Sequence, residues 1–106
     1  MWVFLSNAFL SIVVIEGDSD RLKVRARIAG DIERVFPEAK VEAWTGSDYA
    51  YRAVIDRERV AEALAEAART ISATNFKDSV SERWRHDVYF EVWRAMSAVQ
   101  PQRRAR

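Results

Sequence analysis

Apolar and basic side chains alternate without a break in the stretch Leu22-Lys23-Val24-Arg25-Ala26-Arg27. Successive side chains of a β-strand point to opposite faces, so this period of two predicts a half-buried strand. Its apolar members should face the core, whereas Lys23, Arg25 and Arg27 should face the other way. The stretch therefore defines the two faces of a predicted sheet.

Two further strands are expected before this stretch. The first covers residues 2–5, and the second, residues 9–16, is apolar on both faces, which is typical of a central strand. No Lys or Arg precedes this apolar start, and Ser6, Asn7 and Ser11 interrupt it. We therefore predict a hairpin rather than a signal peptide or a membrane span. A turn over residues 17–20 should lead into the third strand.

A short helix, two strands and two helices are expected after the stretch. Gly30 and Asp31 should begin a short helix that ends at Pro37. Residues 40–44 and 49–55 predict two strands joined as a hairpin. Asp56 should cap the next helix. This helix and a bulky final helix each have apolar residues at helical spacing. The final helix is expected from about residue 80, with Ser79 and Glu82 as a capping box.

This order of elements predicts an α+β protein. We expect a two-layer sandwich with a mostly antiparallel five-stranded sheet, helices on one face and ferredoxin-like features. Residues 1–100 should form a single α+β domain, and residues 101–106 a flexible basic C-terminal tail.

Charge is distributed unevenly along the chain. It has 106 residues, of which 49% are hydrophobic and 31% charged, as in one globular domain. Arg103, Arg104 and Arg106 account for three of its 17 basic residues, which leaves 14 against 16 acidic residues elsewhere. Duplex-binding domains usually show a clear basic excess. The composition therefore disfavours duplex binding.

The residues that most enzymes and metal sites use are scarce. The chain has no cysteine, and its one histidine is His86. This excludes a disulfide framework, a thiolate nucleophile and a sulfur metal site. On a helix His86 should be exposed and pair with Glu82, without a nucleophile nearby. We expect no cofactor, no metal, no catalytic residue and a cytoplasmic location.

The face opposite the helices is the first candidate site. Alternation places cations and one tryptophan on it, an arrangement resembling sheets that bind single-stranded nucleic acid. Two other interpretations are a solvated face with arginine stems covering the tryptophan, or a face buried against a second subunit. The residues of this candidate sheet face are Lys23, Arg25, Arg27, Trp44 and Arg52.

Aromatic residues form the second candidate site, an interface. Trp, Tyr and Arg are enriched among interface anchors, and the bulky last helix favours a homodimer. The spacing of Trp84 favours the core, whereas for Trp44 core and interface are equally supported. The candidate interface residues are Tyr49, Tyr51, Asn75, Phe76, Lys77, Trp84 and Trp93.

Four stretches of the chain resemble a widespread group of small uncharacterised bacterial proteins of similar length. They are Met1-Trp2-Val3-Phe4 with Phe9 to Val13, Leu22 to Arg27, Asp48 to Arg52, and Asn75-Phe76-Lys77 with Val92-Trp93 and Met96. The resemblance implies no activity, cofactor or catalytic residue. It directs attention to Arg25, Arg27, Tyr49, Tyr51, Arg52 and residues 75–77.

Together these features predict a small non-enzymatic interaction protein that self-associates and binds a protein partner. One alternative is a module that binds single-stranded nucleic acid or RNA through its basic and aromatic sheet face. A second alternative is a small-molecule sensor or enzyme without a linear motif. No membrane association is expected.

Overall fold

The computed structural model describes residues 1–101. All of the predicted basic tail except Pro101 therefore lies outside the described residues. The chain forms two compact units, Met1–Ser72 and a second that begins at Ala73, and each is described by itself. The expectation of a single domain over residues 1–100 stays a prediction.

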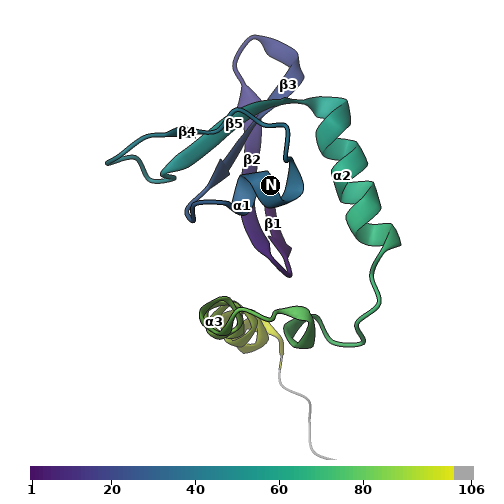
Figure 1. Ribbon diagram of the computed structural model, residues 1–106. Helices are drawn as coiled ribbons and strands as arrows, with labels where there is room; N and C mark the ends of the chain where they lie inside the picture. The colour runs from purple at the N-terminus through teal and green to yellow at the C-terminus, as the bar shows by residue number, and fades with distance from the viewer. Residues whose placement is uncertain (102–106) are drawn as a thin grey trace, which may run out of the picture. The chain divides into compact units, whose positions relative to one another are not determined.

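The first unit contains one five-stranded sheet (Figure 1). Every strand pair is antiparallel, and the order across the sheet is β1-β2-β3-β5-β4. The predicted α+β class and antiparallel five-stranded sheet are confirmed. The strands are β1 (Trp2–Leu5), β2 (Ala8–Ile15), β3 (Asp18–Ala26), β4 (Glu42–Ala43) and β5 (Tyr51–Asp56).

Strand β3 begins four residues earlier than the alternating stretch. The predicted turn over residues 17–20 is too long, because the chain reverses at Glu16 and Gly17 alone. Gly17 has a φ of 80°, a left-handed conformation that glycine adopts without a steric cost. Asp18 then starts the strand, and its carboxylate accepts hydrogen bonds from the backbone N–H groups of Asp20 and Arg21.

Two helices belong to the first unit. Helix α1 (Asp31–Val35) follows Gly30 and ends before Pro37, as predicted. Helix α2 (Arg57–Arg69) begins directly after Asp56. Asp56 occupies the expected N-cap position, but its side chain makes no capping hydrogen bond, so that part of the prediction is wrong.

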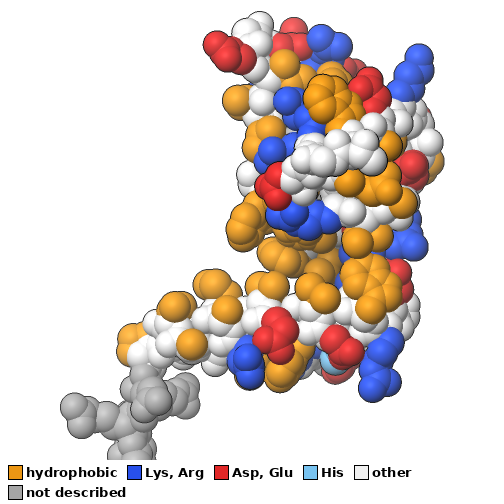
Figure 2. All heavy atoms as spheres, turned by 90° about the vertical axis from the view of Figure 1, so that its left-hand side faces the viewer, with side chains coloured by type: hydrophobic (Ala, Val, Ile, Leu, Met, Phe, Trp, Pro, Cys, Tyr) orange, Lys and Arg blue, Asp and Glu red, His pale blue; other side chains and the backbone are white. Residues whose placement is uncertain are grey.

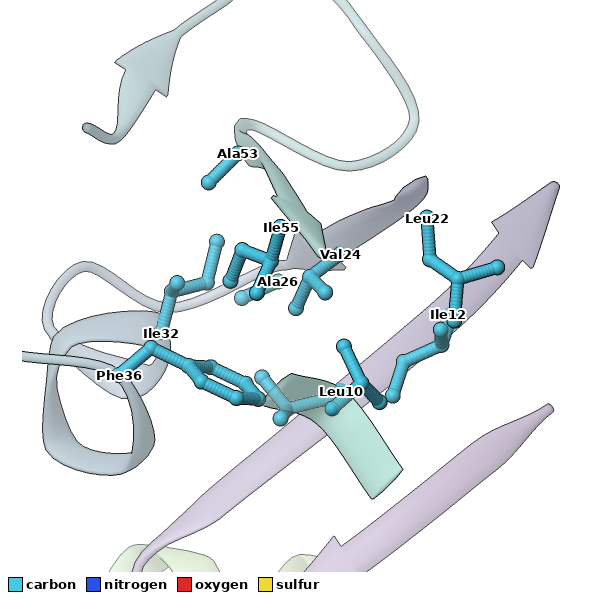
Figure 3. Packing of buried hydrophobic residues seen from close by; sticks show 10 residues of the cluster. Leu10, Ile12, Leu22, Val24, Ala26, Ile32, Phe36, Ala53 and Ile55 are labelled. Carbon is cyan, nitrogen blue, oxygen red and sulfur yellow. The ribbon is translucent and has the colours of Figure 1, made fainter. Parts of the chain in front are cut away.

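The core lies between one face of the sheet and these helices. Figure 3 shows apolar side chains of β2, β3 and β5 converging with Ile32 of α1 and the adjacent Phe36. Helix α2 contributes Val60 from its first turn. We call this side of the sheet the inner face and the opposite side the outer face. The buried cluster comprises Leu10, Ile12, Leu22, Val24, Ala26, Ile32, Phe36, Ala53, Ile55 and Val60.

The second unit contains a short 3-10 helix, η1 (Phe76–Ser79), and the long helix α3 (Arg83–Val99). The predicted capping box is wrong, because the Ser79 hydroxyl donates to the Phe76 carbonyl and closes η1 instead. Asn75 caps η1, its side chain accepting from the Lys77 N–H at 3.0 Å. Among residues 1–101, no helix is both long and apolar enough to cross a membrane.

Candidate functional site

Side-chain alternation along β3 is as predicted. Leu22, Val24 and Ala26 are buried on the inner face, whereas the side chains between them belong to the outer face. The antiparallel register places Arg25 directly opposite Ser11 on β2 and opposite Arg52 on β5. Residues that face each other in register share a sheet face. A polar row therefore runs across three neighbouring strands of the outer face.

Arg25 occupies the middle of this row. Its Nη2 donates to the hydroxyl of Ser11 at 2.7 Å, which satisfies a side chain that is only 1% exposed. Its guanidinium carbon lies 4.5 Å from the centroid of the Tyr49 ring. A cation over an aromatic face is attracted by the ring quadrupole. Arg25 is thus positioned by a hydroxyl and a ring.

Arg27 contacts the same ring from the end of β3. Its guanidinium carbon lies 4.2 Å from the Tyr49 centroid. Its Nη1 also donates to both the carboxylate and the carbonyl oxygen of Asp48, at 3.0 and 2.8 Å. The hydrogen bond with Asp48 raises the pKa of Arg27 above its usual value. Unlike Arg25, this arginine has its charge neutralised within the protein.

Arg52 stacks on the exposed tryptophan of the sheet edge. Its guanidinium carbon lies 4.4 Å from the Trp44 ring, and its Nη2 donates to the Ser47 hydroxyl and the Tyr49 carbonyl. The indole N–H of Trp44 donates to Glu42 at 3.1 Å. Trp44 nevertheless stays 51% exposed. The structure therefore places this tryptophan at the surface.

The outer face combines positive charge with aromatic surface. The predicted sheet-face residues Arg25, Arg27, Trp44 and Arg52 come together through shared contacts with the β4–β5 turn. Lys23 lies on the same face, two residues from Arg25. The Nε atoms of Arg25 and Arg52 are buried, and within residues 1–101 neither has a hydrogen-bond acceptor. Polar atoms in this condition are rare in folded proteins.

The two tyrosines of the candidate interface lie in the sheet. Tyr49 is 5% exposed, beneath the arginines of the outer face, and Tyr51 is half-buried against the core cluster. Both side chains thus pack within the first unit. Their predicted role in an interface stays a prediction.

A second cluster brings together η1 and α3. The ammonium group of Lys77 lies 4.7 Å from the Trp93 ring and 5.4 Å from the Phe90 ring. Phe90 and Trp93 stack on each other with centroids 5.5 Å apart, and Phe76 stacks on Tyr89. The predicted interface residues 76, 77 and 93 therefore share one cluster, which Phe90 and Tyr89 complete.

Trp84 lies elsewhere on α3, and the expectation that it is a core residue is wrong. It is 43% exposed, with the Arg85 guanidinium 4.5 Å from its ring. The buried strip of α3 runs through Arg85 and Tyr89, which are four residues apart and hydrogen-bonded to each other. The four-residue period of apolar side chains predicted a different strip, because a buried arginine leaves no apolar signal in the sequence.

His86 and Asp87 line an open depression of about 500 Å³ on the second unit. His86 Nδ1 lies 3.6 Å from Asp87 Oδ1, and the predicted pairing of His86 with Glu82 stays a prediction. The Glu82 carboxylate accepts a hydrogen bond from Arg85 Nε at 2.8 Å, and the Glu82 carbonyl accepts the backbone N–H of His86. Among the described residues, no group of three or more His, Cys, Asp or Glu is placed to hold a metal ion.

Comparison with known proteins finds no matching family model, no similar curated protein and no similar solved structure. The resemblance to a group of small bacterial proteins stays a prediction.

Proposed function

We propose that this protein is a non-enzymatic interaction module that self-associates through α3. The observation that carries the proposal is the apolar surface of this helix. Figure 2 shows hydrophobic side chains along the helix that leads to the grey residues. The exposed members are Trp84 (43%), Val88 (53%), Phe90 (37%), Trp93 (51%), Met96 (64%) and Val99 (74%).

Such a surface is unusual for a protein that acts alone. Monomeric proteins rarely leave large contiguous apolar patches in water, and such patches mark interaction sites. Tryptophan is the residue most enriched among the anchors of interfaces. The stacked pair of Phe90 and Trp93 is held by Lys77 before any partner arrives, which lowers the entropy lost on binding.

A second copy of the chain is the occupant we favour. The charged side of α3 is neutralised along the helix, because Arg83 pairs with Asp87 and Arg94 with Glu91. Two copies therefore bring no net charge from these residues to their contact. A two-fold pairing lets the same patch serve both partners, and it is the commonest symmetry of oligomers.

Sedimentation equilibrium over a range of protein concentrations tests this proposal. We expect a dimer in the wild type and a dissociation constant about tenfold weaker or more in Trp93→Ala. Trp2→Ala is the matched control, because Trp2 is 67% exposed but lies on β1. A wild-type monomer at every concentration, or equal weakening in both variants, would contradict the proposal.

Binding of single-stranded nucleic acid remains the second candidate function. Three cations of the outer face, Lys23, Arg25 and Arg52, support it, together with the exposed Trp44. The sensor or enzyme alternative and the cytoplasmic location stay predictions.

We also propose a ferredoxin-like description of the first unit as a two-layer sandwich. Its support is the path from β3 through α1 to β4, with β5 inserted between these strands. This is the split β-α-β arrangement, and β2 continues the sheet on its other side.

A further inference from the structure

The outer face carries three cations, and its one carboxylate opposite them in register, Glu42, accepts a hydrogen bond from Trp44 rather than pairing with Arg52 in the described residues. Arg25 and Arg52 lie directly opposite each other on β3 and β5, where like charges repel. Lys23 adds a third cation two residues from Arg25. Within residues 1–101, no carboxylate forms an ion pair with any of the three.

Both guanidinium groups are held in place by neutral partners. Arg25 is fixed by Ser11 and the Tyr49 ring, and Arg52 by Ser47, the Tyr49 carbonyl and the Trp44 ring. All of these hydrogen bonds use Nη2 of the arginine. In the part of the chain that the structure describes, Nη1 of each has no protein acceptor. Both guanidinium groups are therefore held in place by neutral groups, without an ion pair to a carboxylate of the described residues.

We propose that Arg25 and Arg52, with Lys23 beside them, bind a phosphate group on the outer face. In both arginines Nη1 keeps two N–H donors for phosphate oxygens, whereas Nε is buried. A phosphate monoester offers three acceptor oxygens and up to two negative charges, so it can neutralise both arginines at once. A single carboxylate carries only one charge. The site is independent of self-association through α3.

The phosphate can belong to a free small molecule or to a nucleic-acid backbone. Trp44 lies beside the site with half of its surface exposed, next to Arg52. An exposed aromatic ring beside a cationic groove is the arrangement on which single-stranded bases stack. Both kinds of ligand present a phosphate to the site, and a comparison of their affinities shows which of them the site prefers.

Calorimetric titration of the full chain with pyrophosphate, in a low-salt chloride buffer, tests the site. We expect saturable binding that weakens about tenfold or more in Arg25→Gln and in Arg52→Gln. Arg69→Gln is the matched control, because Arg69 lies on α2 and its pair with Glu66 spans 3.8 Å. The control should bind pyrophosphate as the wild type does.

Lys23→Gln keeps the test decisive if an arginine variant unfolds, because removing this side chain breaks no hydrogen bond to the described protein. We expect it to weaken pyrophosphate binding two- to threefold, roughly the loss of one nearby charge. Absence of pyrophosphate binding by the wild type, or equal weakening in Arg69→Gln, would overturn the proposal.

A short single-stranded oligonucleotide, titrated in parallel, separates the two sources. Tighter binding than pyrophosphate, with a steeper loss of affinity as salt rises, supports the site and assigns it to a nucleic-acid backbone. Binding no tighter than that of pyrophosphate supports the site and assigns it to small phosphate ligands. Oligonucleotide binding that is unchanged in Arg25→Gln and Arg52→Gln contradicts the site.

Discussion

The ring of Tyr49 contacts two guanidinium groups at once, Arg27 at 4.2 Å and Arg25 at 4.5 Å from its centroid. Through these contacts the turn between β4 and β5 is attached to β3, although the two segments are more than twenty residues apart in the chain. Asp48, the residue before Tyr49, strengthens the attachment by its ion pair with Arg27. The buried ring is thus the support on which the arginines of the outer face are arranged.

Tyr49→Ala should destabilise the protein by about 3 kcal/mol, because it removes a buried ring and both cation contacts. Tyr49→Phe keeps the ring and should cost less than about 1 kcal/mol. Urea unfolding followed by circular dichroism measures both. Equal stability of the two variants would show that the arginines do not depend on the ring.

Gly30→Ala should destabilise the first unit by about 1–2 kcal/mol, the cost of a side chain in the left-handed conformation. Gly30 has a φ of 92° immediately before α1, and an added Cβ would meet no atom within 4 Å. The cost is therefore conformational rather than steric. Gly30→Asn should cost less, since asparagine tolerates this conformation. Thermal unfolding compares the stabilities of the variants. A Gly30→Ala variant as stable as the wild type would refute the explanation.

The carboxylate of Asp18 should titrate below its usual value of 3.8. The hydrogen bond from the Arg21 side chain is the main cause, followed by that from the Asp20 backbone N–H. Because the folded-state pKa is lowered, this carboxylate stabilises the fold above its unfolded pKa and ceases to do so as pH falls through the folded pKa. A carbon-13 NMR titration should show the pKa of Asp18 rising in Arg21→Gln. An unchanged midpoint would exclude the Arg21 contact as its cause.

Lys77→Ala should weaken self-association through α3, because the ammonium group no longer holds the stacked Phe90 and Trp93. An exposed cation–π contact is worth about 0.5–1 kcal/mol, so we expect a two- to fivefold weaker dimer. Lys77→Arg keeps the cation and should associate like the wild type. Sedimentation equilibrium measures all three proteins. A loss equal in both variants would mean that the cation is not what orders the pair.

Sequence patterning predicted the sheet well because strand alternation is local. Residues 22–27 alternate so regularly that both faces of β3 could be assigned before any tertiary contact was known. The start of β3 at Asp18 could not be assigned in this way. There the strand consists of polar residues, and its pairing is irregular, since Asp18 pairs with Ile15 of β2 across a register shift while Arg21 pairs with Asp56 of β5.

The contacts of the candidate site lay beyond local patterning. The cations of the outer face were predicted, but their partners come from a turn whose approach depends on the register of β3 with β5. On α3 the four-residue apolar period was real, yet the buried positions are Arg85 and Tyr89. Burial of an arginine depends on its hydrogen-bond partners, which composition and spacing do not reveal.

The insertion of β5 between β3 and β4 also bears on how the first unit folds. Strands β1, β2 and β3 are joined by tight reversals, so their pairings close short loops. Pairing of Arg21 with Asp56, by contrast, must close a loop that contains α1 and β4. The entropy lost in that closure is not recovered until the distant strands meet, and pairings of this kind slow folding. The short β4 pairs with β5 across a short turn, so the edge of the sheet that bears Trp44 can form as a local hairpin before β5 reaches β3.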